Sequence, residues 1–338
     1  EVLEQIGPYF DAVGRASERI EVRRRDHALA AKLARDHRVR ANGSVLLLRG
    51  EGEGARAESF EVGITLERAR TRLRTLDGRF QKAFLKLTKP RLELHFTEGH
   101  DERRKSGVEG DPKGLQLQSL MKVLERSNVR AAKLGLTQGL ANEIPDDTPA
   151  VAVVGPRRPF LAEESAALLR YVKRGGRLVL LLDPGADHGL TSMLEQLGLR
   201  LRKGTAASMD KHMRSTFSEA DRGVVIADRF SAHPTVTIAS RSSGRAAVVM
   251  YMAAALAEID RSSRPDGLEV SFPIRSDTRF WRDTNANWTR DPDTEREESL
   301  NLMAAVTVGN EAGKEGRVVL IGDGDFLSDA VFRLPGNQ

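Results

Sequence analysis

Apolar residues follow one another without interruption at residues 151–154, 178–182 and, after an initial arginine, 317–321. A strand has this pattern when both of its faces are covered, as in a parallel sheet. Residues 163–173 repeat their apolar positions on one helical face, so the first two runs and this helix predict a right-handed strand–helix–strand unit. With a further apolar strand at residues 91–96, we expect an α/β protein whose sheet is open and mainly parallel.

The first part of the chain shows a shorter alternation of helices and strands. We expect helices at residues 2–16 and 28–36, and strands at residues 20–24, 45–48 and 58–64. The glycines of residues 50–54 provide a reversal between the last two strands. They resemble a phosphate loop only superficially, because such a loop leads from a strand into a helix. Residues 1–75 are therefore predicted to form a small α/β domain.

One amphipathic helix separates this domain from the rest. Apolar residues at positions i, i+4, i+8 and i+11 predict a helix over residues 76–87, which ends before Pro90. We interpret residues 76–90 as a connecting helix and residues 91–338 as the second, larger domain.

The larger domain contains an irregular stretch from about residue 204 to residue 283. Helices are expected before it at residues 115–125 and 189–197. Its short strand candidates are residues 224–227, 235–239, 246–250 and 268–272. We interpret this stretch as an insertion into the sheet or an extension of it.

Composition narrows the class of protein. The 338 residues are 40% hydrophobic and 30% charged, and no run approaches the roughly 18 apolar residues of a membrane-spanning helix. Cysteine is absent, which removes disulfides, thiolate metal sites and cysteine nucleophiles together. The net charge is +5, but 48 acidic residues are interleaved with the basic ones and aromatics are few, so nucleic-acid binding is not expected. Basic runs such as Arg103-Arg104-Lys105 are interpreted as solvated surface.

The ends of the chain suggest an excised piece. It opens on Glu1 rather than on methionine and stops at Gly336-Asn337-Gln338. We therefore expect anchors or a signal segment outside it.

Polar side chains stand where four predicted strands end, which is where parallel sheets bind ligands. They are His100, Asp101 and Glu102 after the first strand, Arg157 after the second, Asp183 after the third, and Asp323 and Asp325 after the last. If these strands are neighbours, their edge carries an acidic pocket with one histidine that can bind a ligand or partner. The same set suits a divalent cation or acid–base catalysis. Short carboxylates at strand ends also form turns and cap helices, and this structural role is the one we weigh most.

Other motifs argue against common catalytic and metal sites. The run from Asp283 to Trp288 places oxygen ligands like the start of a calcium loop, but Trp288 stands where glycine is needed and Thr294 where a bidentate glutamate is needed. We expect a polar surface loop with the tryptophan packed against it. The sequence has no G-x-S-x-G elbow, HExxH pair or Walker loop, so we predict no metal and no cofactor.

Three blocks occur in order along nearly the whole chain. The first, residues 85–102, contains Glu-Gly-His-Asp-Glu; the second, residues 146–184, contains Val-Ala-Val-Val-Gly-Pro-Arg-Arg-Pro-Phe-Leu-Ala-Glu-Glu; the third, residues 317–329, contains Gly-Asp-Gly-Asp-Phe. Together they resemble the GldG-like accessory proteins of ABC transporters, known from gliding-motility systems.

The resemblance implies a periplasmic region held between membrane helices, a sheet similar to glutamine-amidotransferase-like folds and a thioredoxin-like leading domain, all serving a separate permease and ATPase. The sequence departs from the family pattern at Ala162, where a serine-type helix cap is usual, and at Gly324, which replaces the serine of Gly-Asp-Ser-Asp-Phe. No cysteine occupies an amidotransferase elbow and no Cys-x-x-Cys is present, so neither acyl transfer nor thiol redox chemistry is expected.

The expected function is therefore a non-catalytic accessory domain at the periplasmic face of the inner membrane. It would bind a partner or substrate for an ABC transporter linked to motility or envelope export. Its partners would be the permease and ATPase, other envelope proteins and the membrane through helices outside this chain, and self-association stays open. Two alternatives remain: a scaffold of a membrane machine, and a metal-dependent hydrolase. The hydrolase would use His100, Glu102, Asp183, Asp323 and Asp325.

Overall fold

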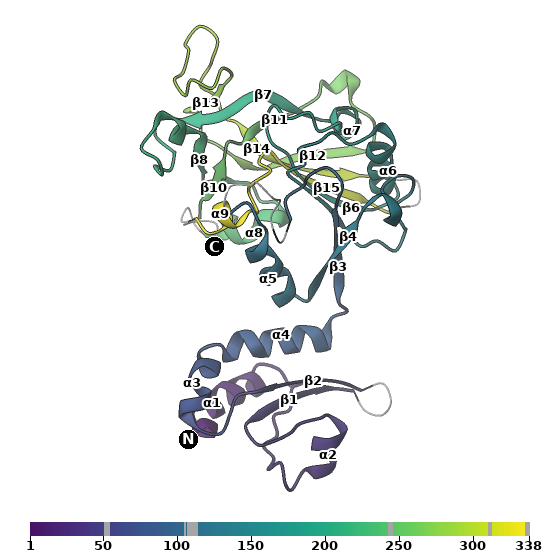
Figure 1. Cartoon of the computed structure of the whole chain (residues 1–338), viewed down its shortest axis with the longest axis vertical. Helices are drawn as coiled ribbons and strands as arrows, with labels where there is room; N and C mark the ends of the chain where they lie inside the picture. The colour runs from purple at the N-terminus through teal and green to yellow at the C-terminus, as the bar shows by residue number, and fades with distance from the viewer. Residues whose placement is uncertain (51–54, 105, 107–113, 243–245, 310–312, 335–338) are drawn as a thin grey trace. The chain divides into compact units, whose positions relative to one another are not determined.

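The computed structural model describes residues 1–50, 55–104, 106, 114–242, 246–309 and 313–334 (Figure 1). The chain divides into two compact units, the first made of residues 1–92 with 124–129 and the second of residues 93–123 with 130–338. Both contain helices and strands, so the protein is a mixed α/β protein. The predicted glycine reversal falls largely on residues 51–54, which lie outside the described residues.

The first unit is a β-hairpin packed with helices. Strands β1 (Ser44–Arg49) and β2 (Arg56–Glu61) pair antiparallel, as the sequence predicted for a reversal between them. The helices of this unit are α1 (Val2–Arg15), α2 (Ala31–Asp36), α3 (Leu66–Arg74) and α4 (Leu76–Thr88). Figure 1 shows α4 along one side of the hairpin and α2 on the opposite side. Leu47 on β1 packs with Ala83 and Leu87 on α4, which buries the apolar face predicted for that helix.

Residues 20–24 are an irregular segment, so the prediction of a strand there was wrong. The arginines of this segment are exposed and pair locally: Arg23 with Glu21 at 2.6 Å and Arg24 with Asp11 at 2.7 Å. A strand needs a neighbour for its backbone ladder, and residues 20–24 do not join the two-stranded sheet of β1 and β2. Helix α3 was not predicted, because its four arginines mask the short apolar stripe that it buries.

The parallel half of the large sheet lies in the second unit. Its strands, in spatial order, are β15 (Gly316–Ile321), β6 (Arg177–Leu181), β5 (Val151–Val154), β3 (Leu92–Thr97) and β4 (Val129–Leu134). The β15–β6, β6–β5 and β5–β3 pairs are all parallel. Helix α6 (Ala162–Lys173) connects β5 to β6, as expected for a strand–helix–strand unit.

The other half of the sheet is antiparallel. It consists of β14 (Asn301–Val308), β11 (Ala254–Glu258), β7 (Leu199–Ser208) and β13 (Phe280–Asp283), with β12 (Leu268–Arg275) beside β14 and β9 (Arg229–Phe230) beside β12. All pairs among these strands, and the β14–β15 pair that joins the halves, are antiparallel. The prediction of a mainly parallel sheet is therefore wrong, and the sheet is mixed. Burial does not reveal strand direction, since β14 is covered as fully as the parallel strands.

The stretch predicted as irregular is largely regular. It supplies β11 to β13 and part of β7, and a separate antiparallel pair, β8 (Val224–Ala227) with β10 (Val248–Tyr251). The strand predicted at residues 235–239 is helical instead, in a 3-10 turn (Pro234–Val236) and α8 (Thr237–Arg241). The ring of Pro234 fixes the backbone for a helical start, and Thr235 N donates to His233 Nδ1 at 3.3 Å.

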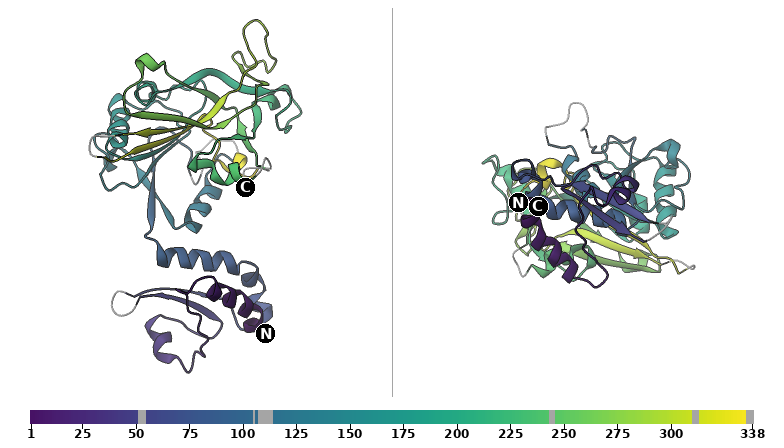
Figure 2. Two further views of the ribbon diagram at one scale, coloured as in Figure 1. Left: turned by 180° about the vertical axis from the view of Figure 1, so that it is seen from behind. Right: turned by 90° about the horizontal axis from the view of Figure 1, so that it is seen from below.

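The remaining described elements are short. They are α5 (Gln118–Arg126), α7 (Thr191–Gln196), α9 (Asp329–Phe332) and the 3-10 turns Leu136–Gln138, Glu219–Gly223 and Arg261–Ser263. Helices α6 and α7 pack against each other beside the large sheet (Figure 2). Their apolar side chains and those of β5, β6, β14 and β15 form one buried core, which fixes the strand ends in place.

The close approach of β15 to α6 gives a test of this packing. A Cβ added at Gly316 would lie 2.0 Å from the carbonyl oxygen of Val172. We expect Gly316→Ala to lower the free energy of unfolding by about 3 kcal/mol, because the backbone of α6 must move. Denaturant unfolding followed by the fluorescence of Trp281 and Trp288, both in the second unit, measures the change.

The matched control is Gly309→Ala, in the same unit. Its added Cβ would meet Gly267 O at 3.6 Å, an ordinary contact. The control should unfold within about 1 kcal/mol of the parent protein. Equal stabilities for the two variants would contradict the packing described for β15.

Candidate functional site

The ends of four parallel strands meet through backbone hydrogen bonds that continue beyond the strands. Gly155 N donates to Leu181 O at 2.9 Å, and Leu182 N donates to Ile321 O at 3.0 Å. Arg103 N donates to Val154 O at 2.9 Å, which draws the chain after β3 to the end of β5. The sequence-predicted residues that follow these strands therefore lie along one edge of the sheet.

A buried arginine lies at this edge among three carboxylates. We call Arg103, Asp183, Asp323 and Asp325 the carboxyl-edge cluster. Arg103 Nε donates to Asp325 Oδ1 at 2.6 Å, and Arg103 Nη2 lies 3.9 Å from Asp183 Oδ2. The Arg103 side chain is 6% exposed, and its Nη1 has no hydrogen-bond partner among the described residues. Interpreting Arg103 as solvated surface was therefore wrong.

The carboxylates of the cluster are held by backbone N–H groups. Asp183 Oδ1 accepts from Gly324 N at 2.8 Å. Asp323 is fully buried and accepts from Tyr251 N at 2.7 Å and from Asp325 N at 2.8 Å. A side chain at position 324 would place its Cβ 2.6 Å from Asp183 Oδ2, so glycine fits here where the family pattern has serine.

Burial and mutual repulsion change the proton affinity of this cluster. Burial, followed by the nearby charge of Asp325, raises the pKa of Asp183, although Gly324 N and Arg103 oppose the change. Burial is also the main reason that the pKa of Asp323 is raised well above its usual value, and the neighbouring carboxylates add to it. Both changes have the same physical causes, which are the loss of water around the carboxyl group and the proximity of like charges.

His100 belongs to a second group of buried side chains, which we call the His100 cluster: His100, Glu102, Glu164 and Phe160. His100 Nε2 lies 2.9 Å from Glu164 Oε2, and Nδ1 lies 3.5 Å from Glu102 Oε1. The imidazole stacks on Phe160 with ring centres 3.9 Å apart. His100 therefore makes its contacts with two glutamates and an aromatic ring, whereas Asp183 and Asp325 approach Arg103.

Both glutamates of the His100 cluster also accept hydrogen bonds from backbone N–H groups. Glu102 Oε2 accepts from His100 N at 2.8 Å, and Glu164 Oε2 accepts from Leu161 N at 2.7 Å at the start of α6. The sequence analysis did not single out Glu164 as a site residue. Glu164 is the third residue after the N-cap Leu161, which is the position of a capping-box glutamate. This position is the sequence signal that could have identified Glu164.

Asp101 and Arg157 lie at the outer rim of this edge. Asp101 adopts a left-handed backbone with φ 53° and pairs with Arg158 Nε at 2.9 Å. The side chain of Arg157 is exposed, and its N–H donates to His100 O at 2.9 Å. With Leu161, which is 61% exposed, they form what we call the rim: Asp101, Arg157, Arg158 and Leu161.

The geometry gives no support to a bound metal ion. Among the residues that the structure describes, no group of three or more His, Cys, Asp or Glu side chains is placed to hold one. The calcium-like loop uses its first carboxylate internally, because Asp283 Oδ1 accepts from Ala286 N at 2.6 Å and Asp283 Oδ2 accepts from Trp288 N at 2.5 Å. Within the described part of the chain, no helix is long and apolar enough to cross a membrane.

Comparison with known proteins gives one family. Residues 91–242 match the family described as "ABC-type uncharacterized transport system". This supports an accessory family of ABC-type transport systems. The matched segment runs from before β3 to the end of α8, so it includes His100 and Asp183 but not Asp323 or Asp325. The match does not distinguish the gliding-motility branch.

Other comparisons add little. No curated protein matches the chain. Among solved structures, the mmIFT52 N-terminal domain is 17% identical with a TM-score of 0.49, over 72% of this chain and 92% of that one. The exo-beta-1,4-mannosidase Op5Man5 from Opitutaceae bacterium strain TAV5 is 13% identical with a TM-score of 0.36, over 78% of this chain and 36% of that one. We draw no conclusion from likenesses this low.

The burial of Arg103 predicts a large effect of its removal. Arg103→Met leaves Asp325 buried without its cation, so the free energy of unfolding should fall by about 3 kcal/mol. The matched control is Arg158→Ala, which breaks the exposed pair with Asp101 and should cost at most about 1 kcal/mol. Denaturant unfolding compares the two, and an Arg103→Met protein as stable as the control would contradict the buried pair.

The raised pKa of Asp183 predicts a pH-dependent effect. A carboxyl group whose pKa is raised in the folded state stabilises the fold at pH values below its unfolded pKa, and this stabilisation is lost as the pH rises through the folded pKa. Asn at position 183 does not titrate, so the stability of Asp183→Asn relative to the parent protein should increase from pH 4 to pH 7. Thermal unfolding across this range, with the exposed Asp266→Asn as control, measures it. A difference that stays constant with pH would show that the Asp183 pKa is ordinary.

Proposed function

We propose that this chain is a non-catalytic accessory component of an ABC-type transport system that works by binding a partner or substrate. The single observation that carries the proposal is the family match over residues 91–242, which contains β3 to β6 and the His100 cluster. The accessory role in ABC-type transport is the part that the match supports directly.

The chemistry of the sheet edge supports a role in contact rather than turnover. The charges of the carboxyl-edge cluster face one another, with Arg103 on Asp325 and Asp323 on two backbone N–H groups. His100 lies between two glutamates. The chain has no cysteine, and position 324 is glycine, so the edge presents no activated nucleophile of the acyl-transfer type.

The finer parts of the proposal rest on the resemblance of three sequence blocks to GldG-like proteins. They are a periplasmic location at the inner membrane, attachment through helices outside this chain, and partnership with a permease and an ATPase for motility or envelope export. The same resemblance underlies the proposal of a glutamine-amidotransferase-like sheet and a thioredoxin-like leading domain.

The rim is the part of this edge that a partner can reach. Leu161 and Arg157 are exposed beside the buried clusters, and Arg158 is held by Asp101 and by Gly99 O, to which its Nη2 donates at 2.9 Å. A small apolar anchor among ordered charges is a common composition for a protein contact. We therefore place the transporter contact on the rim.

Capture of transporter subunits tests the proposal. The protein is co-expressed with the ATPase and permease subunits of an ABC-type transport system from the same source and purified through a tag on this chain. The double variant Arg157→Glu with Leu161→Asp should weaken capture about tenfold or more, since a reversed charge and a buried carboxylate both oppose binding.

The matched control is Arg200→Glu, an exposed charge reversal on β7. It should capture the subunits as well as the parent protein. Failure of the parent protein to capture either subunit would overturn the accessory role. Capture that is equal in the rim variant and the parent would overturn the rim as the contact.

A further inference from the structure

A hollow of the large unit lies beside the short strand β9. It has a volume of about 410 Å³, and its walls include Asp228 with Arg229 and Phe230 of β9, Phe272 and Arg275 on β12, and small residues of α8. This volume is within the range of pockets that hold small organic ligands. None of these residues takes part in the carboxyl-edge cluster or the His100 cluster.

Two like charges face each other across the strands that line this hollow. Arg275 on β12 is the register partner of Arg229 on β9, and both side chains are exposed. Like charges directly opposite in a ladder destabilise the pair of strands. No described carboxylate forms an ion pair with Arg275, and Arg229 only approaches Asp228 Oδ1, at 3.9 Å. The arrangement is unfavourable alone and becomes favourable when an anion lies between the two guanidinium groups.

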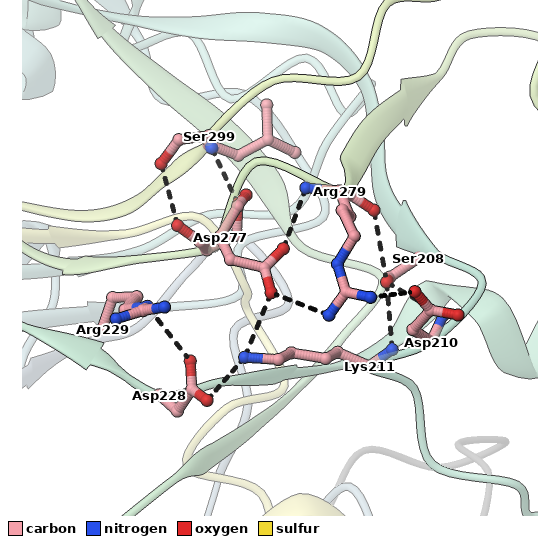
Figure 3. A network of polar contacts seen from close by, with 10 residues as sticks. Ser208, Asp210, Lys211, Asp228, Arg229, Asp277, Arg279 and Ser299 are labelled. Carbon is pink, nitrogen blue, oxygen red and sulfur yellow. Dashed lines mark hydrogen bonds and ion pairs between the residues drawn. The ribbon is translucent and has the colours of Figure 1, made fainter. Parts of the chain in front are cut away.

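The carboxylate at the hollow, Asp228, forms an ion pair with Lys211. Figure 3 shows the ammonium of Lys211 between Asp228 and Asp277, at 2.6 Å and 3.2 Å. Asp277 also approaches Arg279 Nη2 at 3.6 Å, and Arg279 Nη1 contacts Asp210 at 2.6 Å. Asp228 Oδ2 thus contacts Lys211, and Asp228 Oδ1 lies 3.9 Å from Arg229 Nε, so the two arginines outnumber the one carboxylate that lines the hollow.

Aromatic rings provide an apolar wall next to these charges. The guanidinium of Arg275 lies over the ring of Phe272, with Cζ 5.8 Å from the ring centre, which orients its donors. Phe230 lies on the opposite strand, in register with Ile274. Guanidinium groups bind carboxylates and phosphates through paired N–H donors, and a ring or chain attached to the anion would pack on the phenylalanines.

We propose that this hollow binds a small organic anion, with a carboxylate or phosphate group between Arg229 and Arg275 and an apolar portion against Phe230 and Phe272. The proposal is independent of the transporter contact on the rim, because it involves different residues and a different kind of ligand. The binding should be salt-sensitive, since both arginines are open to solvent.

Titration of the whole chain with phenyl phosphate and with benzoate tests the proposal, with inorganic phosphate and benzylamine as comparison probes. Calorimetry at low salt should show saturable binding of one aromatic anion per chain, weaker binding of inorganic phosphate and no binding of benzylamine. The bound anions should also raise the unfolding temperature. Binding of benzylamine, or equal binding of inorganic phosphate and phenyl phosphate, would overturn the proposal.

Substitution of each hollow arginine tests whether the anions bind in the hollow. Arg275→Ala and Arg229→Ala should each weaken the aromatic anions about tenfold or more. Both should stay folded, because each removes a like-charge contact, and the unfolding temperature without ligand checks this. Arg200→Ala, an exposed arginine on β7, is the matched control and should bind like the parent protein. Unchanged affinity in the two hollow variants would overturn the site.

Discussion

The ion pair between Arg103 and Asp325 joins two segments that are 222 residues apart in the sequence. Arg103 follows β3 and Asp325 follows β15, so the pair closes the edge of the sheet across β5 and β6. Taking both charges out of water has a large cost, which is recovered only when each finds its partner in good geometry. The surrounding backbone therefore has to place Gly155, Asp183 and Gly324 closely around it. A Cβ at Gly155 would lie 3.0 Å from Gly324 O.

This closure bears on function. The carboxyl ends of parallel strands are where open α/β sheets usually bind substrates. Here the same place is occupied by two groups of the protein's own side chains, Arg103 with its aspartates and His100 with two glutamates. The exposed groups lie outside, on the rim and beside β9. An accessory component of an ABC-type transport system, which the family match supports, is consistent with this distribution of buried and exposed charge.

Much of the parallel half could be predicted from the sequence, because buried parallel strands are apolar at every position and glycines mark where the helix α6 ends. The strands β5, β6 and β15 and the helix α6 lie within one residue of their expected positions. In the antiparallel half only β12 was expected, at residues 268–272, and β14 was not predicted. The direction of a covered strand could not be predicted in either half, since its pattern is the same whichever way it runs. The strand expected at residues 235–239 failed because Pro234 and the threonines after it favour a helical turn.

The candidate site was predicted only in outline. We expected residues that follow neighbouring parallel strands to meet at one edge of the sheet. Asp183, Asp323 and Asp325 do lie together there. Sequence position could not reveal that Arg103 turns inward while Arg157 stays exposed, because both lie in basic runs and only tertiary packing separates them. It also could not pair His100 with Glu164, a contact between a loop and a helix start that are 64 residues apart.

The most direct test of a self-neutralised edge is a double-mutant cycle between Arg103→Met and Asp325→Asn, measured by denaturant unfolding of the whole chain. If the two side chains are bound to each other in a buried site, their effects are not additive, and the coupling free energy should be about 2 kcal/mol. Additive effects, with a coupling below about 0.5 kcal/mol, would contradict the account, because the edge would then be open and its charges available for other chemistry.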